Sequence, residues 1–329
     1  MAEGAPVDGD EEGVGVDEGE EAAEFDPPEG EGEEKEKRRW AFDEGDEIAP
    51  GRYVLKRLGG GAAYEAHVAW DDMLHTTVVV KVLRPDHVES KRNLEHLRRE
   101  VKILRQLNHP IIVRCFGAVT SGERPHIVLE HLEGLRLSTL IRKYGFLPIE
   151  QLLPLGLQIC GALHYTHAHN IVHLDVKPAN IVMSADPRLI DFSIARTFRQ
   201  AAELTGDVGT RRFMAPEQCL PGKRGIVGPP ADVYGLGATL YRAITGDYAF
   251  EFTAPRTEPD PFVKFPQLTQ EPRPLSDQVP VQLREPVMAT LHPDPAKRPT
   301  AADLSAQLQP LVALLPTSRP LGRRRPRLR

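Results

Sequence analysis

The chain has 329 residues, of which 40% are apolar and 27% charged, a balance typical of a globular protein rather than a membrane-embedded or wholly disordered one. No apolar run approaches the roughly 18 residues that span a bilayer, so we expect no membrane insertion. The net charge is −6, but 15 acidic and no basic residues fall within positions 1–34, so the rest of the chain carries +9. The N-terminus lacks the basic flank and apolar stretch of a signal peptide, which predicts a cytoplasmic location.

Four regions are expected from composition. Residues 1–34 form a disordered acidic tail, 35–51 a linker, 52–315 the folded part and 316–329 a Pro/Arg-rich basic tail. No aromatic residues alternate with the terminal arginines, so nucleic-acid binding is not expected. Electrostatic contact between the two tails, in one molecule or between molecules, is a further hypothesis. The three cysteines, Cys115, Cys160 and Cys219, are too widely spaced for a disulfide framework or a zinc site.

Short segments rich in β-branched residues predict antiparallel strands in the first half of the folded part. The expected strands are Tyr53–Leu58, Glu65–Trp70, Thr76–Leu83, Ile111–Ala118 and His126–Glu130. A helix is expected over 89–107, because Leu94, Leu97, Val101 and Leu104 recur at helical spacing.

Helices dominate the expected second half. We place them at 137–144, 149–168, 231–244, 281–291 and 300–312, with Gly246 ending the third and the proline-rich stretch 250–280 as a loop. Strands followed by helices predict an α+β fold of two lobes, 52–133 and 134–315.

Two features of the first lobe favour a polyanion site without requiring one. Leu58, Gly59, Gly60 and Gly61 leave the first strand and suit either a phosphate-cradling loop or a plain hairpin turn. Lys81 ends an apolar strand interior, where a lysine reaches solvent or meets an anionic partner. Glu100 falls inside the apolar stripe of the predicted helix and is the candidate partner, with an ordinary surface glutamate as the alternative.

The strongest signal is residues 173–180, His-Leu-Asp-Val-Lys-Pro-Ala-Asn, followed by Asp191-Phe192-Ser193. Phosphoryl transfer needs a carboxylate to orient the acceptor hydroxyl, a cation on the phosphate and oxygen ligands for Mg²⁺. Asp175, Lys177, Asn180 and Asp191 provide these types.

With these motifs in this order, the stretch from Arg52 to Leu315 resembles the bacterial members of the eukaryotic-like (Hanks-type) serine/threonine protein kinase family. The resemblance implies a two-lobed kinase fold with a small antiparallel sheet, one regulatory helix and a larger helical lobe. It implies ATP and Mg²⁺ as cofactors and the hydroxyl groups of protein Ser or Thr as acceptors, because Lys177 and Thr210 match the Ser/Thr-specific members.

The resemblance also implies roles residue by residue. Asp175 and Lys177 are catalytic, and Asn180 and Asp191 bind Mg²⁺. Leu129 is the gatekeeper, Glu217 pairs with Arg298, and Asp232 and Gly235 begin the central helix of the large lobe. The ATP site comprises Leu58, Gly59, Gly60, Gly61, Ala66, Lys81, Glu100, Glu130 and Leu132.

Three departures from the family pattern bear on activity. Tyr64 replaces the third glycine of the nucleotide loop, where its side chain points to solvent or folds over the phosphates. Leu174 replaces an arginine that commonly receives a phosphate on the activation segment, so we expect no switch of that kind. Ser193 replaces a glycine after Asp191 and Phe192.

We therefore predict a serine/threonine protein kinase that is able to autophosphorylate. The alternative is a pseudokinase that binds partners without turnover, and a third hypothesis is a kinase-fold enzyme acting on a small molecule. The crowded histidines His164, His167, His169 and His173 predict packing and hydrogen bonding for His173 rather than a metal site.

Overall fold

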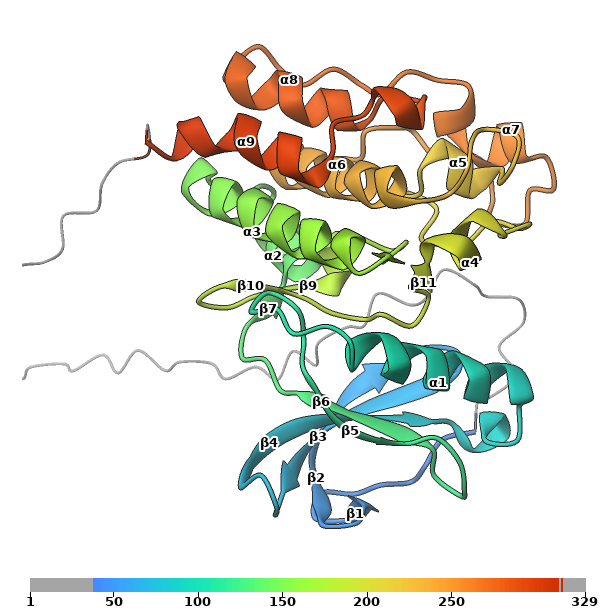
Figure 1. Ribbon diagram of the computed structural model, residues 1–329. Coiled ribbons are helices and arrows are strands. Elements are labelled where there is room, and N and C mark those ends of the chain that lie inside the picture. Colours follow the sequence, from blue (N-terminus) through green and yellow to red (C-terminus); the bar gives the residue numbers. More distant parts are fainter. Residues whose placement is uncertain (1–37, 314, 316–329) are drawn as a thin grey trace, which may run out of the picture.

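The structure is a computed structural model that describes residues 38–313 and 315. It has two lobes, a small lobe built on one sheet and a larger helical lobe (Figure 1). The expected acidic tail 1–34 and basic tail 316–329 lie outside the described residues. Within the described part of the chain, no helix combines the length and apolar character needed to cross a bilayer.

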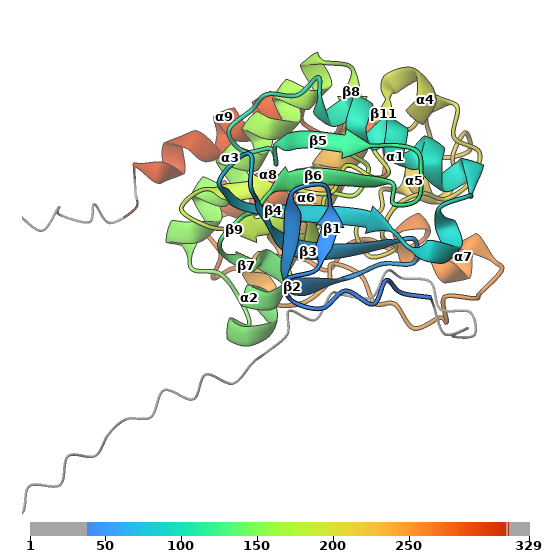
Figure 2. The same cartoon turned by 90° about the horizontal axis from the view of Figure 1, so that it is seen from below.

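The small lobe contains a six-stranded antiparallel sheet with strand order β1-β2-β3-β4-β6-β5. Figure 2 shows its strands side by side in front of the large lobe. The strands are β1 Glu47–Ala49, β2 Arg52–Gly60, β3 Tyr64–Asp71, β4 Thr76–Leu83, β5 Cys115–Val119 and β6 His126–Glu130. Helix α1, Lys91–Leu104, lies beside β5 and β6 and is shorter than expected at both ends. The 3-10 turn η1, Pro85–His87, leads into it.

Alternation along β4 explains the two faces of the sheet. Val78, Val80 and Val82 are fully buried in a small core on the face of the sheet that is turned away from the large lobe, whereas Lys81 points toward the large lobe. On α1, Leu97, Val101 and Leu104 pack into the main core. The helix begins at the N-cap Ser90, whose hydroxyl accepts a hydrogen bond from the Asn93 amide.

Ordered structure begins before Arg52, the expected start of the folded part. Trp40 and Phe42 pack against the small core that contains the β4 valines, and β1 pairs with β2. The Trp40 indole nitrogen donates to the Leu83 carbonyl at 2.8 Å, and the Trp40 amide donates to Glu65 at 3.0 Å. Isolated aromatics in a charged stretch give no periodic signal, so this cover for the sheet was not foreseen.

The large lobe consists of helices stacked on a few short strands. The helices are α2 Leu137–Tyr144, α3 Ile149–Ala168, α4 Phe198–Ala202, α5 Pro216–Cys219, α6 Pro229–Thr245, α7 Pro261–Lys264, α8 Val281–Thr290 and α9 Ala301–Val312. The strands are β7 Leu135–Arg136, β8 Ile171–Val172, β9 Ile181–Met183, β10 Pro187–Leu189 and β11 Arg196–Thr197, and the 3-10 turns are η2 Pro178–Asn180, η3 Pro266–Leu268 and η4 Pro295–Lys297.

The expected α+β architecture is confirmed, with local differences. Helix α6 ends at Gly246 as predicted, because this residue adopts a left-handed φ of 78° and its amide caps the Arg242 carbonyl. The stretch 250–280 is irregular except for α7 and η3. The strand expected over 111–118 is confined to Cys115–Val119, because the Val113 amide bonds instead to Leu189 of β10.

Candidate functional site between the two lobes

The glycine-rich loop joins β2 to β3, and its glycines are required by the tightness of the hairpin. Gly59 has φ of +116°, and a Cβ on Gly60 would lie 2.3 Å from the Tyr64 carbonyl oxygen. On β3, Ala66 is in register with Gly59 on one side and Lys81 on the other. The loop, Ala66 and Lys81 therefore form one continuous surface facing the large lobe, with Leu58 and Gly61 at its edge.

Lys81 lies at the centre of an ion-pair network that joins the lobes. Its Nζ is 3.0 Å from Oε1 and 3.2 Å from Oε2 of Glu100 on α1, and 2.9 Å from Oδ1 of Asp191. Glu100 is only 1% exposed, which confirms its placement inside the apolar stripe. Burial alone would lower the pKa of Lys81, but Asp191 and Glu100 outweigh it and hold that pKa above its ordinary value. The lysine is therefore a permanent cation here.

Asp191 carries the complementary charge. Burial would raise its pKa, but the attraction of Lys81 dominates and holds the pKa of Asp191 well below its usual range. About a third of its side chain, 34%, stays exposed, so solvent screens part of this attraction. Both of its hydrogen bonds, from Lys81 and from the Ser193 amide, go to Oδ1. Oδ2 is thereby left without a hydrogen bond among the described residues and can serve as an oxygen ligand.

Tyr64 folds inward rather than toward solvent. The Lys81 Nζ lies 4.9 Å from the centroid of its ring, and its hydroxyl is 3.5 Å from the Asn93 carbonyl of α1. Burial raises the pKa of Tyr64 to about 12, so the hydroxyl stays neutral and can donate. The signal was present in the sequence, because residues two apart on a strand share a face and Ala66 already faced the cleft.

The segment 173–180 brings the remaining candidate catalytic residues together in the large lobe. Oδ1 of Asp175 accepts a hydrogen bond from the Thr210 hydroxyl at 2.7 Å, and Oδ2 accepts one from the side-chain amide of Asn180 at 3.0 Å. Lys177 Nζ lies 3.0 Å from Asp175 Oδ2 and donates to the Thr210 hydroxyl at 2.6 Å. Asp175, Lys177, Asn180 and Thr210 therefore hold one another in a fixed arrangement, as the motif predicted.

Asp232 on α6 fixes the backbone of this segment. Its carboxylate accepts from the His173 amide at 2.8 Å and the Leu174 amide at 2.7 Å. Leu174 has a φ of 67°, an uncommon conformation for a non-glycine residue, and these bonds hold it there. Close approach matters too, since a Cβ on Gly235 would lie 2.9 Å from the Val176 carbonyl oxygen.

The predicted packing role of His173 is confirmed. Its ring lies 4.6 Å from that of Phe192 in an edge-to-face contact, and the Asp175 amide donates to its Nδ1 at 3.2 Å. The Leu174 side chain is 3% exposed and sits in the core. A phosphate on the activation segment therefore meets no guanidinium at this position.

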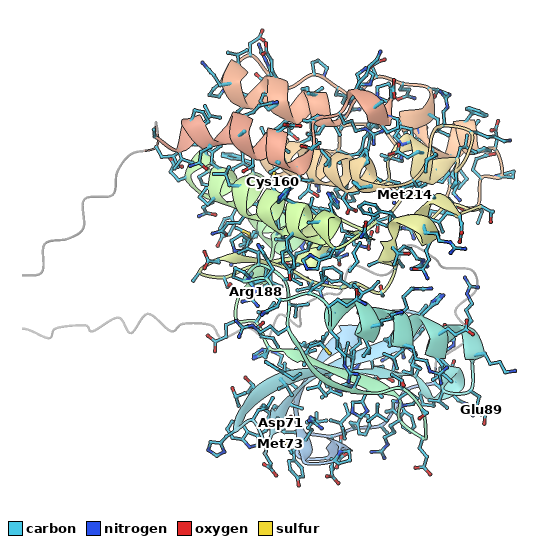
Figure 3. The ribbon with its side chains drawn as sticks, in the orientation of Figure 1. Asp71, Met73, Glu89, Cys160, Arg188 and Met214 are labelled. Atoms are coloured by element: carbon cyan, nitrogen blue, oxygen red, sulfur yellow. The ribbon has the colours of Figure 1, made fainter. Side chains whose placement is uncertain are left out.

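The connection between the lobes carries Leu129, Glu130 and Leu132. The Glu130 amide donates to the Arg114 carbonyl at 2.9 Å, so that donor is already engaged. The Glu130 carboxylate pairs with Arg188 of β10, which Figure 3 shows at the level where the lobes meet. The sequence did not predict this ion pair, because the only role expected of Glu130 was a backbone hydrogen bond to adenine. Backbone contacts of Glu130 and Leu132 to adenine stay a prediction.

The residues present fit a magnesium site. Mg²⁺ takes oxygen ligands and is commonly held by one or two carboxylates together with substrate phosphates. The side-chain N–H groups of Asn180 donate to Asp175, which leaves its Oδ1 as an oxygen ligand, and Oδ2 of Asp191 is a second one. The described residues contain no group of three His, Cys, Asp or Glu side chains suited to a metal, so phosphate oxygens would complete the coordination.

In the small lobe, Lys81 of the sheet is paired with Glu100 of α1, and it also meets Asp191 of the helical lobe. This combination of fold and site defines a protein kinase domain. The model of the protein kinase domain family matches residues 53–308, and the chain belongs to this family.

Similar curated proteins are bacterial kinases. Serine/threonine-protein kinase PknB of Mycobacterium leprae is 33% identical over 264 residues, which are 76% of this chain and 41% of that protein. PknB of Mycolicibacterium smegmatis is 33% identical over 273 residues, 78% of this chain and 42% of that protein. Serine/threonine-protein kinase PknK of Mycobacterium tuberculosis is 36% identical over 263 residues, 78% and 23% respectively. The chain thus carries a protein kinase domain, as its motifs indicated, and spans about two fifths of the length of the PknB relatives.

Proposed function

We propose that this domain transfers the γ-phosphoryl group of Mg-ATP to Ser or Thr hydroxyls of proteins, its own chain included. The observation that carries the proposal is that two groups of residues are both in place: the ion pairs of Lys81 and the hydrogen bonds around Asp175. Lys81 is bonded to Glu100 and Asp191 at 2.9–3.2 Å, and Asp175 is held by Thr210 and Asn180. A site in which either set were apart would need rearrangement before transfer.

In this proposal each polar group has one task. Asp175 orients the acceptor hydroxyl and accepts its proton as the oxygen bonds to the γ-phosphorus and the bond to ADP breaks. Lys81 binds phosphate oxygens from the small lobe, and Lys177 places a second cation beside Asp175. Asn180 and Asp191 provide the oxygen ligands for Mg²⁺, which neutralises phosphate charge when bound. The loop from Leu58 to Gly61 covers the phosphates, with Ala66, Glu130 and Leu132 around the base.

The acceptor class follows from the Lys177–Thr210 contact. Thr210 bridges Asp175 and Lys177 through its hydroxyl, with bonds of 2.7 and 2.6 Å. This bridge holds the segment after Thr210 close to the catalytic carboxylate, which favours the short side chains of Ser and Thr over tyrosine.

The test is transfer of labelled phosphate from ATP with Mg²⁺ to the chain itself and to a generic basic protein. Asp175→Asn and Lys81→Met each alter one of these two groups of residues and should abolish the label. Asp277→Asn and Lys102→Met make the same chemical changes on exposed surfaces and serve as matched controls. Label in the controls but not in the site variants supports the kinase. Nucleotide binding without any label overturns the proposal in favour of a pseudokinase.

Location and tail contacts belong to the same proposal. Cys115, Cys160 and Cys219 are all free thiols, which supports the reducing environment of the cytoplasm. We propose that acidic residues 1–34 attract the arginines of 319–329, in one molecule or between two. Association that weakens from low to high salt in the full chain, and is lost when either tail is deleted, would support this contact. An oligomeric state indifferent to salt and to both deletions would overturn it.

A further inference from the structure

We propose that Arg212 and Arg242 select acceptor sequences that carry acidic side chains beside the Ser or Thr. The inference rests on the proposed function, because it names the class of protein substrate that the same site takes. The surface lies on the large lobe and is formed in part by the residues that come directly after Thr210 in the chain. None of the candidate catalytic groups belongs to it.

The location of this surface follows from chain connectivity. The Thr210 hydroxyl is 2.7 Å from the Asp175 carboxylate, so Thr210 adjoins the point where the acceptor hydroxyl must lie. Consecutive Cα atoms are about 3.8 Å apart, so Arg211 and Arg212 lie within two residue lengths of Thr210. A polypeptide that presents a hydroxyl to Asp175 must pass close to them.

Two guanidinium groups share one aromatic ring here. The Cζ of Arg212 and the Cζ of Arg242 each lie 4.1 Å from the centroid of the Tyr248 ring. Arg212 also lies 5.7 Å from the Phe252 ring, and Phe213 packs edge-to-face on Tyr248 at 5.9 Å. Cation–π contacts of this kind attract each guanidinium group to the face of the ring. Both cations are therefore held against the same aromatic side chain.

No acidic residue of the described chain neutralises this pair. Neither Arg212 nor Arg242 has a carboxylate within ion-pair distance among the described residues, and Arg242 donates only to the Gly246 carbonyl. Nearby carboxylates are engaged elsewhere, Asp207 with Lys264 at 3.1 Å and Glu251 with Arg273 at 2.7 Å. Asp247 precedes Tyr248 but is exposed. Two like charges around one ring repel each other, so an added anion is attracted to both.

Arg211 has a different task. Its guanidinium donates to the Lys264 carbonyl at 2.8 Å and the Ala254 carbonyl at 3.0 Å, which ties the segment after Thr210 to the loop before α7. Arg211 therefore supports this segment, while Arg212 and Arg242, both partly exposed, face a ligand. A guanidinium group donates paired hydrogen bonds to a carboxylate, so Asp and Glu side chains are the ligands that this pair of arginines suits.

The test is a set of serine peptides that differ only in carrying Asp, Ala or Lys at each position flanking the acceptor. We expect Asp at one or more positions to raise kcat/KM about tenfold over Ala, which corresponds to about 1.4 kcal/mol, and Lys to lower it. In the double variant Arg212→Glu/Arg242→Glu the preference should invert toward Lys. Arg212→Lys/Arg242→Lys should keep a weaker acidic preference. Lys102→Glu/Arg284→Glu, on α1 and α8, makes the same change in net charge away from Tyr248 and should leave the preference as it is.

Thermal unfolding of each variant checks that it folds. If the double variant does not, Arg212→Gln replaces it and should reduce the acidic preference at least threefold. Equal use of all peptides by the wild type, or an acidic preference that survives in the variants, overturns the inference. Absence of transfer to every peptide overturns the proposed function instead, and anisotropy of labelled peptides then tests the same charge preference without turnover.

Discussion

Glu217 and Arg298 form a fully buried, two-bond ion pair across 81 positions of sequence. Arg298 Nη1 is 2.6 Å from Glu217 Oε1, and Nη2 is 2.8 Å from Oε2, with neither side chain exposed. The remaining donors of Arg298 reach carbonyl oxygens of Pro230, His292 and Pro293, so the guanidinium is saturated. The pair, foreseen from the resemblance, joins α5 at the end of the activation segment to the turn before α9.

Removing one partner of this pair should destabilise the domain strongly. Arg298→Ala or Glu217→Ala leaves a buried charge without its partner, and we expect a loss of about 3–5 kcal/mol in the free energy of unfolding. That is a large share of the roughly 5–15 kcal/mol available to a domain. Urea unfolding measures it.

The exposed pair Arg199–Glu203 provides the control for Glu217→Ala. It lies on α4 with 88% and 61% of its side chains exposed, so Glu203→Ala should change the free energy of unfolding by less than about 0.5 kcal/mol. Equal effects of Glu217→Ala and Glu203→Ala would contradict a structural role for the buried pair.

Tyr64 should contribute to stability and to nucleotide binding through its packing. Tyr64→Gly restores the family glycine but removes the ring from Lys81 and α1. We expect a loss of about 2–4 kcal/mol in unfolding free energy and a higher KM for ATP, because the hairpin is no longer held on α1. Tyr64→Phe keeps the ring and should stay close to wild type in both measurements. A stable, tighter-binding Tyr64→Gly variant would show that the inward tyrosine obstructs the site instead.

Local patterns were sufficient to place much of the site. Helical spacing placed Glu100 on the buried face of α1, and the alternation of β4 turned Lys81 away from its valine neighbours. The groups of the segment 173–180 lie within one short loop, so sequence spacing nearly determined their contacts. Residue type also identified Asp191, but its contact with Lys81 joins positions 110 residues apart in the sequence, which spacing could not predict.

Contacts between irregular segments were out of reach. Trp40 reaches Leu83, and Arg212 reaches Tyr248, through loops whose path no period of two or 3.6 residues describes. Glu130 and Arg188 are likewise brought together only by the packing of one lobe on the other.

Trp40 should stabilise the sheet of the small lobe. It bonds to Leu83 and Glu65, stacks on Phe42 at 6.0 Å and lies 5.3 Å from the Arg124 guanidinium. Trp40→Ala should lower the free energy of unfolding by about 2–4 kcal/mol, since a partly buried aromatic and its hydrogen bond are lost. Trp40→Phe should recover part of this, because the phenyl ring keeps part of the packing although the hydrogen bond to the Leu83 carbonyl is lost.

Tryptophan fluorescence offers a direct readout of that contact. The chain has two tryptophans, so Trp70→Phe leaves Trp40 as the only reporter. Its emission should shift to longer wavelength at the same urea concentration at which the domain unfolds. A shift at much lower urea would show that the segment detaches on its own and does not stabilise the sheet.

His96 on α1 should make the domain less stable in mild acid. Burial, followed by repulsion from Arg99 and Arg196, lowers the pKa of His96 from 6.5 to about 4. Between these values the unfolded chain binds a proton that the folded chain does not, so stability falls as the pH drops from about 6.5 toward 4. His96→Gln removes this contribution, and its unfolding free energy should therefore fall less steeply over that interval. His164→Gln on the exposed side of α3 is the matched substitution, and a slope changed equally by both variants would rule out His96 as the source.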